Sequence, residues 1–231
     1  MKYLIKQELK RITLCSHFIG LIIANIIICF LGITTFLFLR VGEHLLANMG
    51  LPTIQLGMLD ISFMLVRATL IVWQSVFIAT IIIEEYKNKT ISLLFSYPIN
   101  RTRLIMSKII LICGIMLLFH IGSLVFQHGM VYLLSRELEF VVYSLGSLFN
   151  QIVITLSTIL LGLFPLFVGM LKKSTIATII SSLIIIAMVS NSQGTNAGLL
   201  SLPLFAIVFG FIGLIFAAIT IKKMITSDLY T

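Results

Sequence analysis

The sequence predicts an all-α, polytopic membrane protein with six transmembrane helices and with both termini in the cytoplasm. Of its 231 residues, 59% are hydrophobic and 10% are charged, whereas soluble domains carry roughly 25% charged residues. The mean hydropathy is +1.16. The apolar runs are ~20 residues long and do not alternate with polar residues, which favours helices over a membrane β-barrel. Lipid is therefore the expected solvent for most of the surface.

Residues 1–14 are predicted to form an amphipathic helix that lies on the membrane surface. At helical spacing, Lys2, Lys6 and Lys10 share one side of this helix and apolar residues share another. A basic flank that merely orients the first span would look the same, and the two interpretations are compatible.

Six apolar runs are interpreted as membrane spans of a single transmembrane domain, 1–231. They are residues 17–39, 61–83, 109–134, 152–171, 175–189 and 204–221. Pro165 predicts a kink in the fourth span. At ~1.5 Å per residue, the fifth span is shorter than the ~30 Å hydrocarbon core. Residues 190–202, which follow it, are polar and contain glycine, so a re-entrant helix is left open there.

The distribution of basic residues predicts the orientation. With the N-terminus inside, Arg40 and Arg136 fall outside the cell and Arg67 falls within the second span, while the other thirteen of the 16 Lys and Arg residues face the cytoplasm. The net charge of +8 therefore sits in short clusters between apolar runs. It is a topology signal, and it does not indicate a nucleic-acid partner.

The most informative polar stretch is the cytoplasmic segment 84–103, between the second and third spans. It begins with Glu84 and Glu85, and a short helix is predicted from Thr90 to Tyr97, with Thr90 as its N-cap and Pro98 as its end. This helix would expose the apolar residues Ile91, Leu93, Leu94 and Phe95. An apolar element of this kind either lies on the membrane or docks in a groove of a partner.

The order of residues in this segment resembles the coupling segment of ABC-2 type transporter permeases. The shared order is Glu, then Thr-x-x-Leu-Leu, then Tyr-Pro-x-x-Arg, then Lys, and it spans residues 84–108. Lys89 stands where the family usually has glycine before the threonine. The six-span layout and the basic N-terminal helix also resemble this family, in particular its small members that export antimicrobial peptides or give immunity to them.

The resemblance implies a division of labour between subunits. A cytosolic ABC ATPase subunit would bind ATP and magnesium, and this chain would bind no cofactor and catalyse no reaction. Six spans resemble half of a transporter, which implies a second permease copy or a paralogue in the bacterial plasma membrane, surrounded by lipid. The residues that would dock the ATPase are Glu84, Glu85, Thr90, Ile91, Leu93, Leu94, Tyr97, Pro98 and Arg101.

Polar residues within the spans are candidates for a translocation path. They are Arg67, His120 and Gln127. Arg67 lies two turns from Asp60 on the same helical face, about 10 Å along the axis, so it either extends outward toward that carboxylate or lines the path. His120 and Gln127 are two turns apart on one face of the third span. No third ligand accompanies them, which argues against a metal site.

Two other classes of function compete with a transporter. A pore or holin-like protein that works without ATP fits the apolar spans but leaves the exposed cytoplasmic helix unexplained. An intramembrane protease is faintly suggested by Glu84-Glu85 followed by Lys89, yet that motif requires Arg at the last position, and its further histidine motifs are missing.

The cargo is the least determined part of the prediction. The spans are rich in Ile, Leu and Phe and carry little charge besides Arg67, which favours an apolar or amphipathic cargo over a sugar or an ion. A peptide is the first expectation, and a drug or a lipid the next. The direction of transport and the choice between homodimer and heterodimer stay open.

Overall fold

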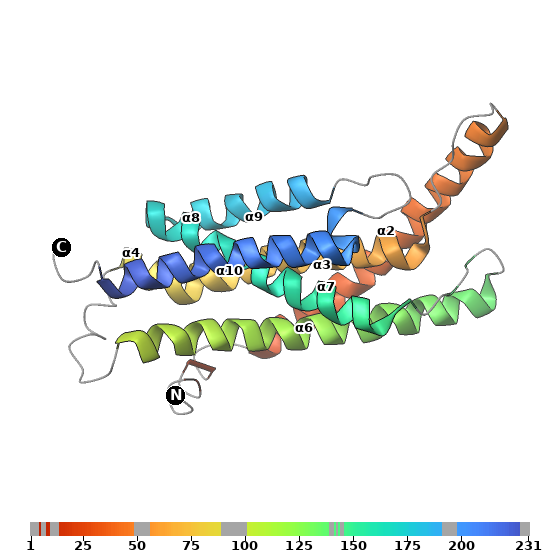
Figure 1. The fold of residues 1–231 in the computed structure, drawn as a ribbon. Helices are drawn as coiled ribbons and strands as arrows, with labels where there is room; N and C mark the ends of the chain where they lie inside the picture. The colour runs from red at the N-terminus through yellow and green to blue at the C-terminus, as the bar shows by residue number, and fades with distance from the viewer. Residues whose placement is uncertain are drawn as a thin grey trace.

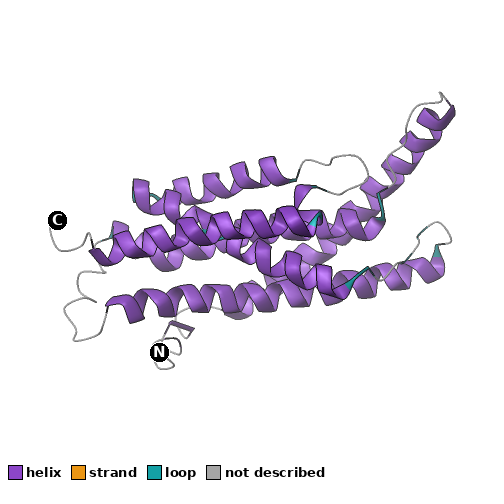
Figure 2. Cartoon of the chain, in the orientation of Figure 1, coloured by secondary structure: helices purple, strands orange, loops and turns teal. Residues whose placement is uncertain are grey.

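The described part of the chain is a bundle of long helices that lie side by side, and it contains no strand (Figures 1 and 2). In the computed structural model, the residues described are 5, 8, 9, 14–48, 56–88, 101–138, 141, 143, 146–190 and 198–226. The helices are α2 (Leu14–Asn48), α3 (Met58–Ile78), η1 (Ala79–Ile83), α4 (Glu84–Lys87), α6 (Arg101–Glu137), α7 (Leu148–Leu161), α8 (Phe164–Lys172), α9 (Thr175–Val189), η2 (Leu199–Ser201) and α10 (Pro203–Thr226).

Within these residues, five helical stretches are long and apolar enough to cross a membrane. They are Leu14–Glu43, Met58–Lys87, Thr102–Glu137, Leu148–Lys172 and Pro203–Thr226. The remaining apolar helix is α9, whose 15 residues span about 22 Å at 1.5 Å per residue. The all-helical, multi-pass class predicted from the sequence is confirmed, with α9 as the short sixth candidate span.

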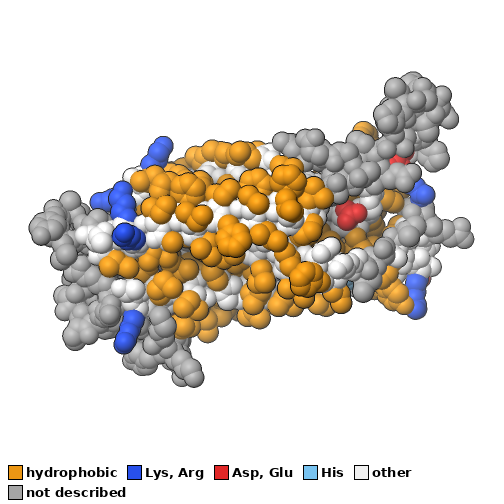
Figure 3. Space-filling model, in the orientation of Figure 1, with side chains coloured by type: hydrophobic (Ala, Val, Ile, Leu, Met, Phe, Trp, Pro, Cys, Tyr) orange, Lys and Arg blue, Asp and Glu red, His pale blue; other side chains and the backbone are white. Residues whose placement is uncertain are grey.

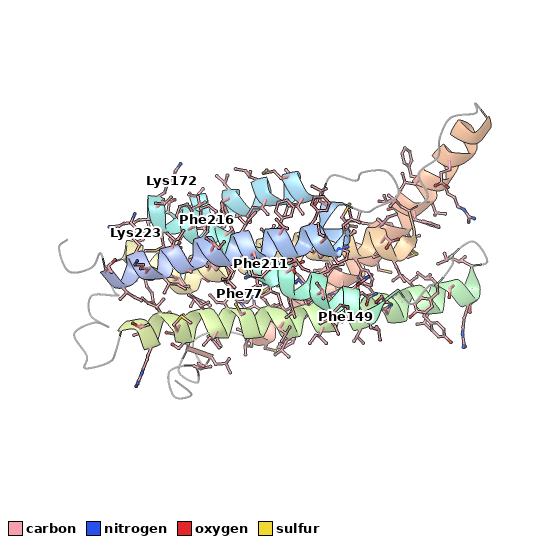
Figure 4. The ribbon with its side chains drawn as sticks, viewed as in Figure 1. Phe77, Phe149, Lys172, Phe211, Phe216 and Lys223 are labelled. Carbon is pink, nitrogen blue, oxygen red and sulfur yellow. The ribbon has the colours of Figure 1, made fainter. Side chains whose placement is uncertain are left out.

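The surface of the bundle matches a lipid environment. Large apolar side chains are exposed along α2, α6, α7, α9 and α10, and Figure 3 shows them over the middle of the bundle, with Lys and Arg near its two ends. Phe149 and Phe211, labelled in Figure 4, are 73% and 60% exposed. Such continuous apolar exposure would be unfavourable in water, so these side chains face lipid.

We call the end of the bundle where α4 ends and α6 begins the inner end, and the opposite end the outer end (Figure 1). Lys172 and Lys223 lie at the inner end (Figure 4). Arg136 lies in the last turn of α6, and Arg40 lies in the C-terminal third of α2, both toward the outer end. The predicted topology places the inner end in the cytoplasm.

Helix α3 is the central element of the bundle, since it contacts α2, α6, α7, α8 and α9. It continues without interruption through the π-helical turn η1 into α4. Its side chains Val66, Leu70, Phe77 and Ile78 belong to the largest cluster of buried apolar residues. The second span therefore forms the core around which the others pack.

Helices α7 and α10 cross at two glycines of α10. A Cβ on Gly213 would lie 2.6 Å from Cα of Leu161, and a Cβ on Gly210 would lie 3.0 Å from Cα of Ser157. Small residues let two membrane helices approach to backbone contact, which strengthens their van der Waals packing.

The fourth span is interrupted near Pro165, as the sequence predicted. Helix α7 ends at Leu161, and α8 begins at Phe164 with Pro165 in its first turn, where a missing N–H is tolerated. Gln74 of α3 donates from Nε2 to the carbonyl of Ile159 over 2.9 Å. The side chain of Gln74 lies against Gly162 at the break, so any larger residue at that position would collide with it.

Several predicted segments lie outside the described residues. They include most of the N-terminal helix 1–14 and the coupling helix Thr90–Tyr97. Of the proposed re-entrant stretch 190–202, residues 191–197 lie outside as well. In the described remainder, Ser190 caps α9 and residues 199–201 form a 3-10 turn, η2, which is followed by α10.

Candidate functional site

At the inner end, three charged side chains meet in what we call the Lys108 cluster, formed by Glu8, Glu85 and Lys108. The Nζ atom of Lys108 lies 2.8 Å from Oε2 of Glu85 and 2.9 Å from Oε1 of Glu8. It also donates to the carbonyl of Ile81 over 3.2 Å. The side chains of Lys108 and Glu85 are only 3% and 4% exposed. A buried charge is tolerated because each one is paired and hydrogen-bonded.

The Lys108 cluster joins the two ends of the predicted coupling segment. Glu85 is in α4, at the end of the second span, and Lys108 is about two turns into α6, near the start of the third span. The acceptor Ile81 lies in the π-helical turn η1, and such turns occur frequently at functional sites. The two spans that border segment 84–103 are thus tied together by charge.

The structure separates the two glutamates that the sequence assigned jointly to ATPase docking. Glu84 is exposed, whereas Glu85 is buried in the Lys108 cluster. Arg101 is the first residue of α6, and its side chain is outside the described part. The other predicted docking residues, Thr90, Ile91, Leu93, Leu94, Tyr97 and Pro98, lie outside the described residues, so the docking assignment stays a prediction.

A second polar site is a cavity of about 270 Å³ in the outer half of the bundle, which we call the Arg67 cavity. Its polar lining comes from α3, α6, α7 and η2 and from the residues before α7. These residues are Asp60, Arg67, His120, Ser147, Asn150, Gln151, Thr155 and Ser201. The cavity therefore brings together residues from four separate helical elements and one connecting segment.

The side chain of Arg67 extends toward the outer end of α3. Its Nε atom donates to the carbonyl of Phe63 over 2.9 Å, and its Nη2 atom donates to Oγ of Ser201 over 3.3 Å. The Nη1 atom is buried and has no hydrogen-bond partner. The sequence offered Asp60 as the ionic partner of Arg67, but no ion pair joins these two described residues, although both line the cavity.

The two polar residues predicted on the third span have different surroundings. His120 lines the Arg67 cavity and is 2% exposed. Its Nδ1 atom lies 2.9 Å from the carbonyl of Met116, which makes Nδ1 the donor, while Nε2 has no partner. Gln127 instead donates to the backbone and side-chain oxygens of Asn25 over 3.1 and 3.2 Å. Gln127 therefore joins α6 to α2 and does not line the cavity.

Asn25 completes this interhelical network. Its Nδ2 atom donates to Oγ of Ser123 and to the carbonyl of Leu21, both over 2.9 Å. Polar side chains that bond across helices stabilise membrane bundles, because lipid offers no alternative partner. The asparagine in the first span thus holds α2 against α6.

Sequence reasoning missed several residues that these two sites contain. Glu8 carried a usable signal, since it is the single acidic residue in the basic segment 1–14. Asn150, Gln151 and Ser201 carried none, because they precede or begin apolar runs and resemble ordinary helix-end residues. Only the packing of α7 and η2 against α3 brings them to Arg67.

The described residues contain no group of three His, Cys, Asp or Glu side chains that could hold a metal ion. Cys15, Cys29 and Cys113 are free thiols.

Comparison with known proteins gives two matches. The sequence profile of the ABC-2 family transporter proteins matches residues 16–191. The chain is also 30% identical to the uncharacterized protein YcbO of Bacillus subtilis (strain 168) over 216 residues, which cover 90% of this chain and 92% of that protein. No solved structure matches the chain significantly.

Proposed function

The chain belongs to the ABC-2 family of transporter proteins and is a permease subunit of an ABC transporter, and from this premise we propose that it exports an apolar or amphipathic cargo with energy from a separate cytosolic ATPase. ABC-2 permeases generally work with such a subunit. The chain is a multi-pass protein of the cell membrane.

The sequence supports placing ATP hydrolysis on another subunit. A phosphate-binding loop of the common ATPase type ends in Gly-Lys followed by Ser or Thr. None of the 15 glycines of this chain is followed by lysine. ATP and magnesium are therefore assigned to the partner.

The observation that carries the docking proposal is the Lys108 cluster. It fixes the end of α4 to the start of α6 through the 2.8 Å ion pair between Glu85 and Lys108, and a second pair of 2.9 Å ties Glu8 of the N-terminal segment to the same lysine. A segment held at both ends by such a cluster can pass a force from its middle to two membrane spans at once. We assign ATPase docking to this segment, with Leu93 and Leu94 as its apolar anchors and Glu84 as its exposed acid.

A complete transporter requires a second set of spans, and we propose that a second permease copy or a paralogue supplies it. The cargo assignment is supported by the apolar surface of the spans and by the mixed polar lining of the Arg67 cavity. A peptide, above all an antimicrobial one, is the first candidate, and a drug or a lipid the next. Arg67 and His120 are proposed to contact it, with Gln127 holding the third span in place.

Capture of partners from the native membrane tests this function against an ATP-independent pore. The full chain, solubilised with a mild detergent, is purified through an affinity tag, and the proteins that accompany it are identified by mass spectrometry. We expect a soluble ABC ATPase in near-stoichiometric amount. Purification of the folded chain without any ATPase, together with ion conductance of the purified chain in planar bilayers, would contradict the proposal and favour a pore.

A further inference from the structure

The Arg67 cavity continues into an apolar groove between α6 and α7. This groove has a volume of about 480 Å³ and shares Leu124, Gln151 and Thr155 with the cavity. Its walls are formed by apolar side chains such as Ile121 and Ile152, which are 48% and 58% exposed. A polar pocket and an open apolar groove therefore form one continuous surface.

The groove has the length of one bilayer leaflet. It follows α6 from Leu117 to His128, a distance of about 17 Å at 1.5 Å per residue. Half of the hydrocarbon core measures about 15 Å. The exposed side chains of α6 and α7 along the groove face the lipid phase, so an acyl chain can enter it sideways from the bilayer.

The two full charges of the cavity lie in a fixed order along the membrane normal. Asp60 is in the first turn of α3, and it is exposed at the outer rim beside Gly57. Arg67 is seven residues deeper, about 10 Å along the helix axis, and its side chain extends outward to Phe63. From outside to inside, the surface therefore presents an acid and then a guanidinium group, and the apolar groove runs beside them from the level of Phe63 inward along α6 to Leu117.

This order is complementary to a phospholipid whose head group ends in an amine. Such a lipid presents an ammonium group outermost, then a phosphate, then acyl chains. The unpaired Nη1 atom of Arg67 is a donor that a phosphate oxygen would satisfy, and hydrogen bonds between ions are the strong ones. Native structures seldom leave such a buried donor unpaired without a ligand or water nearby.

We propose that this surface binds a zwitterionic, amine-headed phospholipid of the outer leaflet. Arg67 receives the phosphate, Asp60 receives the ammonium group, and the groove between α6 and α7 receives one acyl chain. The inference goes beyond the transport function, because the lipid is a ligand of the permease itself; Arg67, which we also assign to the cargo path, is then shared between the lipid and the cargo.

Photolabelling of the purified full chain tests the proposal without the ATPase, so that its outcome is independent of the docking assignment. Three probes carry the same diazirine-bearing acyl chain and are added to the chain in an uncharged maltoside detergent. They are a phosphatidylethanolamine, a phosphatidylglycerol and a diacylglycerol. Labelled residues are located by peptide mass spectrometry.

We expect labelling within residues 117–128 and 148–156 in the order phosphatidylethanolamine, phosphatidylglycerol, diacylglycerol. Arg67→Gln should lower the labelling by both phospholipids about tenfold, since it removes a hydrogen bond between charged groups. Asp60→Asn should abolish the preference for phosphatidylethanolamine over phosphatidylglycerol. Arg136→Gln is the matched control, because Arg136 lies near the end of α6, outside the cavity lining, and it should change nothing.

A second pair of variants keeps the test decisive if Arg67→Gln fails to fold. Ile152→Trp places bulk in the open groove and should block labelling, whereas Ile180→Trp, on an exposed face of α9 outside the groove, should not. Equal labelling by all three probes would overturn the proposal. An unlabelled groove would overturn it as well, as when a second copy of the chain or a peptide cargo covers this surface.

Discussion

Lys108 shows how a single side chain can decide the structure at a helix end. It lies just inside the third span, where a lone ammonium group would be costly to bury. Two carboxylates and one backbone carbonyl surround its Nζ atom. The cost of burial is thereby offset, and the N-terminal segment is connected to both spans that border segment 84–103.

Lys108→Met tests this role. The substitution leaves the carboxylates of Glu85 and Glu8 close together without their cation, and breaking a buried ion pair in this way typically costs about 3–5 kcal/mol. We expect a markedly lower thermal unfolding midpoint for the purified chain in detergent. Lys172→Met is the matched control, because Lys172 is exposed at the same end of the bundle. Equal midpoints for the two variants would show that the cluster does not stabilise the fold.

At the scale of elements, α7 and α10 can cross closely because α10 carries glycines, which have no side chain, at the contact. Gly210 and Gly213 let α10 meet the backbone of α7 around Ser157 and Leu161. Close to this contact, Phe216 of α10 packs against Phe164 and Phe167 of α8, with ring centroids 5.0 and 4.8 Å apart. The fourth span is thus held to the sixth on both sides of its break.

Gly213→Val should push these helices apart. The new side chain would overlap the backbone at Leu160 and Leu161, and overpacking of this kind costs about 1–3 kcal/mol. We expect a lower unfolding midpoint in detergent and weaker cysteine cross-linking between α7 and α10. Gly114→Val is the control, since no atom lies within 4 Å of a Cβ at that position on α6. The same loss of stability in both variants would contradict the packing account.

The sequence predicted those elements whose determinants are local. Each apolar run forms a helix, and α9 begins after Ser174, whose hydroxyl accepts from the backbone N–H of Ala177 over 3.4 Å. Pro165 marked the break in the fourth span. The role of Gln74 at that break could not be predicted, because its partner Ile159 is 85 residues away.

The same limit applies to the two sites. Arg67 and His120 stood out as polar residues inside apolar spans, but their common cavity depends on packing among α3, α6, α7 and η2. Gln127 stood out equally, yet its partner is Asn25 on the first span. Helical periodicity gives the face on which a side chain lies, but not the helix that it meets.

At the scale of the whole molecule, one continuous helix connects the two sites. Arg67 lies in α3 and Glu85 in α4, and η1 joins these two helices without a gap. Eighteen residues separate them, about 27 Å along the axis. This helix is a continuous structural connection between the coupling segment at the inner end and the cavity in the outer half.

The orientation of the molecule can be measured by cysteine labelling after Cys15, Cys29 and Cys113 are replaced. A cysteine at Asn88 or Ser174 should react with a membrane-impermeant maleimide only after permeabilisation. A cysteine at Asn48 or Glu139 should react in intact cells, because the distribution of basic residues places these two positions outside. Labelling of Asn88 from outside would refute the topology and, with it, the docking of a cytosolic partner.

The central claim is that segment 84–103 couples this permease to its ATPase. Docking by a short helix depends on a few buried apolar anchors, and truncating such an anchor typically costs ~2 kcal/mol or more. Leu93→Ala combined with Leu94→Ala should leave the spans inserted, because both residues precede the third span. Asn100→Ala, after the proline, is the matched control.

The most direct measurement is ATP hydrolysis by the reconstituted complex of permease and ATPase in proteoliposomes. We expect the double variant to lose ATPase capture and transport-linked hydrolysis, while the Asn100→Ala complex keeps both. Normal binding and normal stimulation of hydrolysis by the double variant would contradict the coupling assignment.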